Sequence, residues 1–475
     1  MTINLFNSIG LNMARPSISL FVLTMMNLAA ILSIKTLPFA AGFGLGSVLL
    51  ILLVILGFMV PVAFISAELA TAWPQTGGVY IWVKEAFGHK IGFLAVWLLW
   101  IESVVWYPTI LTFIAGALGY VVGVDLSNNP WFTAISINVI YWAMTLFNLQ
   151  GVKESGIFTS CSVIIGTLIP GAVIILLGFG WYLSGNPIEI PMNLQNAVPD
   201  VTSLSSLAII AGLVESYAGI EMNAIHANDV QNPQKNFPVA ILVTLIILAI
   251  FSTLGTLSVA MVLPPNSISF TSGGIETVAY IFQKYQLSYL TPFVGIFIAV
   301  GALGSVSNWI IGPSRGLLMA AKHGDLPPFF HKTNKKGMPL GMLVLQGLLV
   351  SVMSTLFIIL PSINQSFWIL EVIVAQLYII MYILMFAAAI RLRYAQPQVH
   401  RPFKVPGGSI GFWLTNIVGF VVFIFILVMG FVPPNELGGV DSKDYELIQI
   451  FGVLLLVAAP FIITLFKKPS WDEIS

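Results

Sequence analysis

The chain has 475 residues, of which 58% are hydrophobic and 8% are charged, and its formal net charge is zero at pH 7. This composition excludes an ordinary soluble domain, and the lack of a basic excess argues against a nucleic-acid partner. Because a bilayer's hydrocarbon core is about 30 Å thick, a crossing helix needs about 20 apolar residues. We therefore expect an all-α integral membrane protein whose single transmembrane domain occupies residues 1–475.

Apolar runs of this length follow one another along the whole chain and predict twelve transmembrane helices. They cover residues 17–40, 45–70, 91–122, 131–149, 156–183, 205–224, 237–262, 288–321, 339–360, 366–392, 410–432 and 446–466. The first fifteen residues show no small-residue cleavage site, so we expect the first helix to be retained rather than removed as a signal peptide. The connections 78–90 and 274–282 have the pattern of short amphipathic helices.

The positions of the basic residues predict the orientation. With the N-terminus inside and the helices alternating, fifteen of the 19 Lys and Arg residues fall in inner loops and tails. Only Lys284 and Lys443 fall outside, while Lys35 and Arg315 lie in or near the membrane. Because cytoplasmic loops carry the excess of Lys and Arg, we expect a multi-pass protein of the inner (plasma) membrane with both termini in the cytoplasm.

Two of the predicted helices look discontinuous. The first, over 17–40, holds Asn27, Ser33 and Lys35 before Pro38, and the sixth, over 205–224, holds Gly212, Glu215, Ser216, Tyr217, Gly219 and Glu221. They lie five helices apart, the spacing of inverted five-helix repeats, and paired interrupted helices are the best sequence indication of a transport site in mid-membrane. The alternative is two kinked packing helices with glycines at close contacts.

Several segments carry a resemblance to a known family. They are Pro61–Ala70, Trp73–Tyr80, Ser216–Glu221, Asn232–Pro238, Ser258–Pro264, Trp309–Gly316 and Arg401–Gly408. With these segments in this order, the chain resembles members of the amino acid–polyamine–organocation superfamily. Within the superfamily it resembles the glutamate/γ-aminobutyrate antiporter branch. The resemblance implies a leucine-transporter-like fold with helices 1–5 (17–183) and 6–10 (205–392) as inverted repeats, helices 11–12 (410–466) at the periphery, and exchange of amino acids or their decarboxylated amines.

Two features depart from that family. The superfamily commonly has a Gly-Ser-Gly turn in helix 1, where this chain has Ile31-Leu32-Ser33. We therefore expect Lys35 to take over part of the binding of a substrate carboxylate. The branch also carries a long C-terminal tail that plugs the inner mouth, and the chain ends at Ser475. We therefore expect no pH gating by such a plug.

Ionisable residues in apolar runs are the strongest site candidates, because an ionisable group in hydrocarbon is costly unless it is paired, hydrated or used. Lys35 is predicted to face the pocket and to pair with Glu215 when the site is empty; the alternatives are an interfacial lysine and a solvated glutamate. Glu221 and Glu102 are candidates for proton coupling or for structural hydrogen bonds. Glu371 is a weaker candidate of the same kind.

Other candidates come from position and side-chain type. The resemblance places Trp309 against the pocket, where an indole offers an apolar wall and a cation–π face. Tyr378 and Tyr382 share one face of helix 10 and are expected to close the outer side of the site, with plain core packing as the alternative. Glu68 and Arg315 are expected near the cytoplasmic face as inner-gate or structural ion-pair residues. Ser33, Ser216, Tyr217 and Gly219 complete the predicted substrate-binding set.

These observations predict a secondary active amino-acid antiporter whose ligands are small amino acids or amines. Cys161 is the only cysteine and the five histidines show no metal-ligand spacing, so neither a metal nor a cofactor is expected. No phosphate-binding loop or catalytic constellation indicates an enzyme. A proton- or sodium-coupled symporter or a uniporter remains an alternative, and a channel or membrane receptor is more remote. The oligomeric state stays open.

Overall fold

A computed structural model of the chain describes residues 18–122, 129–191, 193–199, 201–264, 273–360, 363–433 and 442–471. The expectations about the first fifteen residues and about the end of the chain lie outside these ranges. Within them the protein is helical, and its only β-bridges are the isolated pairs Ile18–Val230 and Thr333–Pro339.

The first half of the chain forms nine α-helices with two π-helical segments among them. They are α1 (Leu20–Ile31), α2 (Thr36–Ala41), α3 (Gly46–Val54), η2 (Ile55–Met59), α4 (Val60–Ala72), α5 (Val79–Phe87), α6 (His89–Val122), α7 (Pro130–Asn148), α8 (Val152–Val163), η3 (Ile164–Leu168) and α9 (Ile169–Leu183). The π-helical segments join α3 to α4 and α8 to α9, so each pair forms one long rod. The predicted amphipathic segment 78–90 contains α5.

The second half repeats the pattern of long apolar helices. Its elements are α10 (Leu204–Glu215), the 3-10 segment η5 (Met222–Asp229), α11 (Pro233–Val262), α12 (Gly273–Lys284), α13 (Thr291–Lys322), α14 (Leu340–Ser354), α15 (Leu356–Ile359), α16 (Ile363–Ala395), α17 (Gly408–Met429) and α18 (Ser442–Leu465). Helix α12 covers the predicted amphipathic segment 274–282. Short 3-10 turns also lie at Leu194–Ala197, Ser288–Leu290, Pro328–His331 and Pro469–Trp471.

Ten helices among the described residues are long and apolar enough to cross a membrane. They correspond to ten of the twelve predicted runs. The other two runs, 17–40 and 205–224, are divided: α1 is separated from α2 by residues 32–35, and α10 is separated from η5 by residues 216–221. We call these gaps the first and the second interruption.

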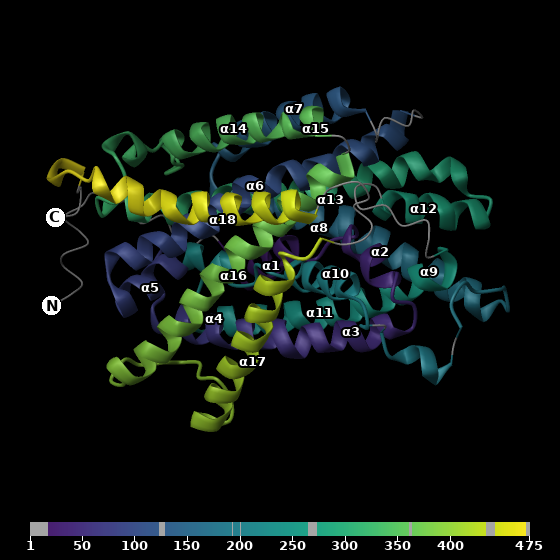
Figure 1. Cartoon of the computed structure of the whole chain (residues 1–475), viewed down its shortest axis with the longest axis horizontal. Helices are drawn as coiled ribbons and strands as arrows, with labels where there is room; N and C mark the ends of the chain where they lie inside the picture. The colour runs from purple at the N-terminus through teal and green to yellow at the C-terminus, as the bar shows by residue number, and fades with distance from the viewer. Residues whose placement is uncertain are drawn as a thin grey trace.

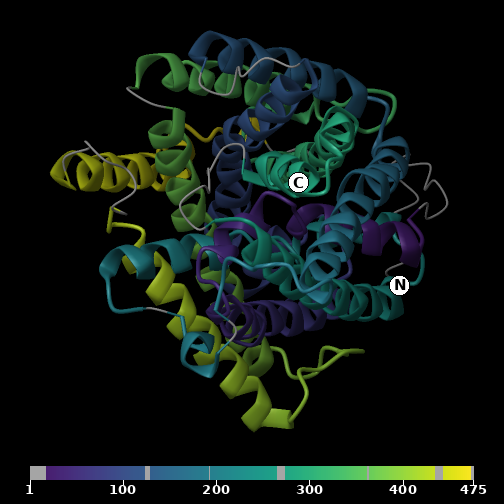
Figure 2. The same cartoon turned by 90° about the vertical axis from the view of Figure 1, so that its right-hand side faces the viewer.

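Most of the long helices run roughly along the horizontal axis of Figure 1, α16 and α17 cross it obliquely, and the interrupted segments lie among them. Helices α7 and α14 lie along the upper edge of that view, and α1 and α10 lie between them and α3. Viewed along the long axis, the purple segments α1 and α2 lie near the centre, while yellow α18 lies at the left edge (Figure 2). Burial agrees with this placement, because the apolar window of α6 is 78% buried and that of α18 is 17% buried.

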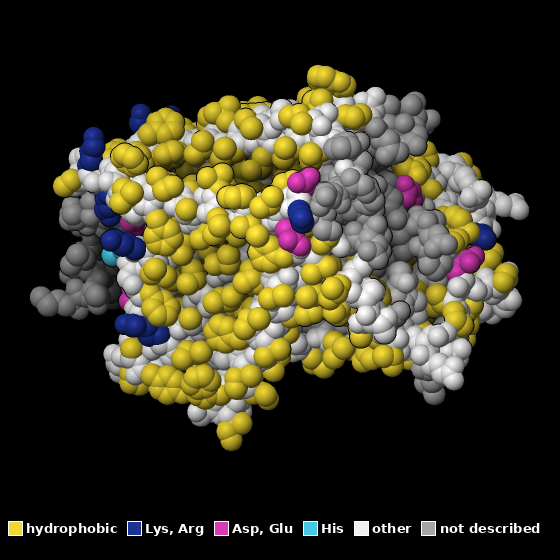
Figure 3. Space-filling model, viewed as in Figure 1, with side chains coloured by type: hydrophobic (Ala, Val, Ile, Leu, Met, Phe, Trp, Pro, Cys, Tyr) yellow, Lys and Arg dark blue, Asp and Glu magenta, His cyan; other side chains and the backbone are white. Residues whose placement is uncertain are grey.

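The basic residues gather at one end of the bundle. Lys and Arg side chains cluster at the left-hand end in Figure 3, which is where α5 and the end of α18 lie in Figure 1. We call this the basic end and define it by Lys84, Arg393 and Lys467. The clustering follows the asymmetry that the sequence predicts for the cytoplasmic side.

Candidate functional site

The first interruption lies among the long helices of the bundle. Helix α1 ends at Ile31, Leu32 is extended (φ −100°, ψ 117°), and α2 begins at Thr36. The turn is held locally, because the Lys35 N–H donates to Ser33 Oγ at 3.2 Å and the Thr36 hydroxyl donates to the Ser33 carbonyl at 2.8 Å. The polar cluster that marked this position in the sequence therefore builds the turn.

The second interruption depends on a glycine. Gly219 has φ +118°, a conformation that L side chains rarely adopt. A Cβ atom there would lie 2.8 Å from Trp309 Cζ2, so the indole packs directly against the glycine backbone. The Gly219 N–H donates to the Tyr382 hydroxyl at 2.9 Å. Gly219 thus shapes the site through its backbone.

Both interruptions border one cavity of about 70 Å³, which we call the pocket. That volume is room for several waters. Helices α6, α13 and α16 and the segment η3 form the remaining walls. Of the predicted substrate-binding and coupling residues, the pocket is lined by Ser33, Lys35, Glu102, Glu215, Ser216, Trp309 and Tyr378. Tyr217, Gly219, Tyr382 and Glu221 lie behind these, and Glu68 and Arg315 lie at the basic end.

Lys35 is paired with Glu371, a residue of α16. Lys35 Nζ lies 2.8 Å from Glu371 Oε1, and the side chains are 7% and 13% exposed. The ammonium also lies 4.5 Å from the centroid of the Phe367 ring, one turn earlier on α16. The prediction that Glu215 is the partner of Lys35 is therefore wrong. No local pattern indicates this pair, because its members are 336 positions apart in the chain.

Glu102 and Glu215 line the same pocket without such a partner. Glu102 is 2% exposed, and its Oε1 atom is buried with no hydrogen-bond partner among the described residues. Glu215 is 6% exposed and makes no ion pair within 4 Å in that part of the chain, although it lies within electrostatic range of Lys35. An unpaired carboxylate in such a place is costly, so each group needs a proton or a cation.

Tyrosines of α16 hold the second interruption. Tyr378 and Tyr382 each donate a hydroxyl hydrogen bond to Glu221, both at 2.7 Å, and their rings stack with centroids 4.8 Å apart. Tyr382 lies one turn closer than Tyr378 to Arg393 and thus to the basic end. The expectation that the tyrosines close the outer side of the site stays a prediction. Their shared face was predicted correctly, and here it binds the Glu221 carboxyl group.

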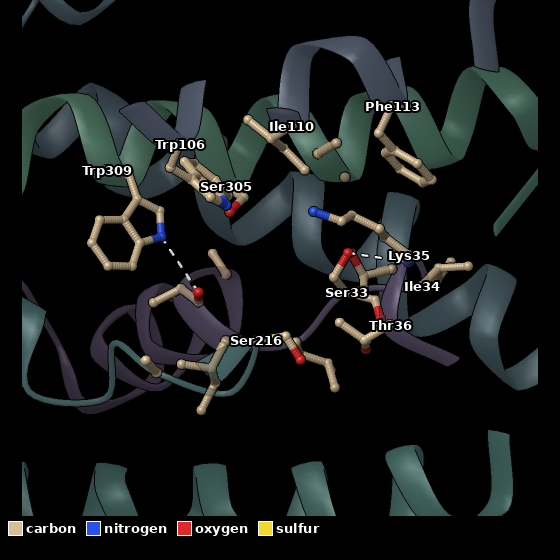
Figure 4. A pocket seen from close by; sticks show the side chains of 18 of the residues that line it. Ser33, Ile34, Lys35, Thr36, Trp106, Ile110, Phe113, Ser216, Ser305 and Trp309 are labelled. Atoms are coloured by element: carbon tan, nitrogen blue, oxygen red, sulfur yellow. Dashed lines mark hydrogen bonds between the residues drawn. The ribbon is translucent and has the colours of Figure 1, made fainter. Parts of the chain in front are cut away.

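Two tryptophans form an aromatic end of the pocket (Figure 4). The Trp309 and Trp106 ring centroids are 5.7 Å apart, and Trp309 Nε1 donates to the Ala30 carbonyl at 3.3 Å. Lys35, Ser33 and Phe113 lie at the other end in that view. Trp106 was missed at the sequence level, although its spacing of four from Glu102 and seven from Phe113 places all three on one face of a helix.

The remaining predicted residues form ion pairs at the basic end. Glu68 is 2.5 Å from Arg393 Nη2 and 3.4 Å from Arg401 Nε, and it accepts the Val405 N–H at 2.9 Å. These contacts join α4 to the end of α16 and to the segment that follows it.

Arg315 forms a second cluster there. Its Nη1 atom donates to Asp229 Oδ2 at 2.5 Å and to His226 Nδ1 at 2.9 Å. Burial and the Arg315 charge lower the pKa of His226 to about 3. The imidazole is therefore neutral and accepts the arginine N–H. No group of three or more His, Cys, Asp or Glu residues in the described ranges has an arrangement that suits a metal ion.

Two interrupted segments that meet at a cavity, inside a shell of long apolar helices, are typical of membrane transport proteins. The chain matches the family model described as amino acid permease over residues 17–458. It is 38% identical to an uncharacterized transporter of Legionella pneumophila, over 98% of this chain and 99% of that protein. The chain therefore belongs to the amino acid permease family, within the amino acid–polyamine–organocation superfamily, which confirms the resemblance.

Other relatives carry more specific names. A glutamate/γ-aminobutyrate antiporter of Lactococcus lactis is 31% identical, over 97% of this chain and 93% of that protein. A probable agmatine/putrescine antiporter of the same species is 24% identical, over 80% of this chain and 81% of that protein. The family is thus a transporter family whose members are named for amino acids and amines.

Proposed function

We propose that this protein is a secondary active antiporter that exchanges amino acids or their amine derivatives across the inner (plasma) membrane. The observation that carries the proposal is that both interruptions border one pocket that holds a lysine and several carboxyl groups. Free backbone N–H and C=O groups at helix interruptions bind the charged ends of small solutes. The names of the relatives, which include glutamate/γ-aminobutyrate antiporters, support an exchanger of this type.

The proposed architecture counts each interrupted segment as one crossing. Together with the ten long apolar helices this gives twelve transmembrane helices. The interruptions then fall in helices 1 and 6, as in a leucine-transporter-like fold with two inverted five-helix repeats. The basic end faces the cytoplasm in this proposal, and so do both termini.

The Lys35–Glu371 ion pair defines where the substrate carboxylate binds. Lys35 binds the substrate carboxylate after that group displaces Glu371, and Glu215 binds the amine. Ser33, Ser216 and the backbone of the two interruptions complete the site, and Trp309 forms its apolar wall. Alternating access then exposes the pocket to one side at a time, and the ion pairs of Glu68 and Arg315 at the basic end open and close with it.

A counterflow measurement tests this function. Proteoliposomes are preloaded with a labelled amino acid, and its efflux is followed with and without unlabelled amino acid outside. An antiporter releases the label only when an external substrate is present, whereas a channel or uniporter releases it without one. Trp309→Ala should abolish exchange while the protein still purifies as a monodisperse species. Normal exchange by that variant would remove Trp309 from the site.

Proton-coupled symport is the second candidate, and the unpartnered Glu102 and Glu215 favour it, because carboxyl groups without a cation can carry protons. Coupling through Glu221 belongs to the same candidate. A pH-sensitive dye inside the liposomes separates the two functions. A symporter acidifies the lumen as substrate enters an empty vesicle, whereas an obligatory exchanger of zwitterions leaves the dye unchanged.

A further inference from the structure

The residues that line the pocket differ chemically between its two ends in Figure 4. One end holds the Lys35–Glu371 ion pair, which is already neutral as a pair. The opposite end is formed by Trp106 and Trp309 (Figure 4). Along α6, Glu102 comes one helical turn before Trp106, whereas Ile110 and Phe113 follow Trp106 and lie toward Lys35 in Figure 4.

Glu102 is the unexplained group at this second end. Its side chain is 2% exposed, it lines the pocket, and its Oε1 atom has no hydrogen-bond partner in the described part of the chain. The charged groups that act on it are the carboxyl groups of Glu215, Glu221 and Glu371. All three are acidic, so none of them compensates a negative charge on Glu102, and the lysine of the pocket is already paired with Glu371.

The aromatic side chains beside Glu102 are an independent indication of a cation. Trp106 and Trp309 stand next to each other, with ring centroids 5.7 Å apart and planes inclined at 46°. Tyr378 closes this wall with its ring centroid 5.9 Å from that of Trp309. Aromatic faces around a desolvated carboxyl group are the usual recognition site for an ammonium ion. A substrate with a purely apolar side chain would need only the aromatic wall and not the carboxyl group of Glu102.

We propose that Glu102, Trp106 and Trp309 form a subsite for a distal ammonium group of the substrate, at the end of the pocket opposite Lys35. This inference rests on the proposed function and names the substrate class: amino acids that carry a second, cationic amine on their side chain, and ω-amino acids. The carboxylate binds Lys35 and the distal ammonium binds Glu102.

The spacing along α6 sets the length of such a ligand. Glu102 and Ile110 are eight residues apart, which corresponds to about 12 Å along the helix axis at 1.5 Å per residue. The side chains of Lys35 and Glu102 both extend into the pocket and shorten the distance that the ligand must span. A flexible stem of several methylene groups suits this gap and packs against the indoles.

Matched ligands test the subsite directly. Lysine and norleucine share a carboxylate, an α-ammonium group and a four-carbon side chain, and only lysine has the distal ammonium. Binding of both is measured on the purified full-length protein at pH 7 by isothermal titration calorimetry, together with the pair 6-aminohexanoate and hexanoate. We expect the aminated member of each pair to bind about ten- to hundredfold more tightly, as expected for a charge-assisted contact.

The Glu102→Gln variant keeps the shape of the side chain and removes its charge. It should reduce the preference for lysine over norleucine to less than about threefold, while norleucine affinity stays unchanged. Trp106→Phe should reduce the preference by a smaller factor, because a phenyl ring is a weaker cation–π partner. Glu154→Gln is the matched control, since Glu154 lies 39% exposed on α8 and should leave both affinities unchanged.

The outcomes separate the two proposals. Equal affinity for lysine and norleucine in the parent protein, or a preference that survives Glu102→Gln, overturns the ammonium subsite. Tighter binding of glutamate than of lysine at pH 7 also overturns it. If norleucine and other apolar amino acids are exchanged without any preference for a distal amine, the antiporter function stands and the subsite falls. Absence of counterflow with every amino acid and amine, by protein that remains monodisperse, overturns the proposed function itself.

Discussion

Carboxyl groups of the two clusters at the basic end have cationic partners, whereas two of those that line the pocket do not. Glu68 forms ion pairs with two arginines and accepts a hydrogen bond from a backbone N–H, and Asp229 forms an ion pair with Arg315. Glu102 and Glu215 make no ion pair among the described residues. Glu371 is paired with Lys35, the one lysine that lines the pocket in that part of the chain. A buried charge without a partner is destabilising, so its persistence points to a role outside folding. The ion pairs of the basic end therefore stabilise the arrangement of helices seen here, whereas Glu102 and Glu215 are left without a partner for a ligand or a proton.

The largest effect is expected at Glu68. Glu68→Ala leaves Arg393 and Arg401 without their shared anion, and breaking a buried pair costs about 3–5 kcal/mol. We expect a large drop in the thermal unfolding temperature of the purified protein. Glu85→Gln is the control, because Glu85 is 37% exposed and lies 4.0 Å from Lys84. Unchanged unfolding of Glu68→Ala would show that the ion pairs of the basic end do not stabilise the fold.

Substitutions in the pocket are expected to weaken substrate binding more than they lower the stability of the fold. Lys35→Ala removes a charge-assisted contact of about 1.5–3 kcal/mol, so a ligand with a carboxylate should bind about ten- to hundredfold more weakly. The matching amine without a carboxylate should lose much less. Calorimetry with lysine and cadaverine measures both. Equal losses for the two ligands would make Lys35 a partner of Glu371 alone.

The double variant Lys35→Ala/Glu371→Gln sharpens this result. It removes both charges, so any destabilisation that comes from leaving Glu371 unpaired should disappear. If the weaker carboxylate binding persists in the double variant, Lys35 itself contacts the substrate. If affinity returns to that of the parent, the single variant acted through the stranded glutamate.

Gly219 tests whether the shape of the second interruption matters separately from its charges. Gly219→Ala adds a Cβ atom 2.8 Å from Trp309 Cζ2 in a strained backbone conformation. We expect exchange to fall by about tenfold, because the indole must move away from its position at the pocket. Gly185→Ala is the control, since Gly185 also has a positive φ (+73°) but no atom within 4 Å of the added Cβ. Equal effects of the two variants would attribute the loss to backbone strain.

The sequence located the interruptions because their signals are local. Ser33 and Lys35, like Gly219, disfavour continuous helix in a bilayer through their own polarity or flexibility, so a short window suffices. The face shared by Tyr378 and Tyr382 followed from helical periodicity for the same reason. All ten uninterrupted runs were recognisable from length and apolar content.

The contacts between distant helices could not be predicted in this way. Lys35 has both Glu215 and Glu371 within reach of its charge, and only the position of α16 beside the first interruption selects the nearer carboxyl group. Glu221 binds two tyrosines 157 and 161 positions away, which makes it part of a local scaffold as well as a coupling candidate. Trp106 was overlooked because tryptophan is common in packed membrane helices, and its spacing from Glu102 becomes informative only when the pocket is known.

The smallest effect concerns the dependence of stability on pH at the basic end. His226 is neutral in the folded protein, with its pKa lowered to about 3 by burial and by Arg315, against about 6.5 in the unfolded chain. The unfolded chain therefore binds a proton between these values and the folded protein does not. The contribution of His226 to stability is fully present above about pH 6.5 and is lost as the pH falls toward 3.

His226→Gln removes this titration while its amide can still accept from Arg315. We expect the unfolding temperature of the parent to fall more steeply than that of the variant between pH 6.5 and pH 4.5, with both measured in the same detergent. Because every other titratable group is common to the two proteins, their difference isolates the imidazole. Parallel curves over this range would mean that the folded protein takes up the proton at His226, and that the Arg315–His226 hydrogen bond does not hold the ring neutral.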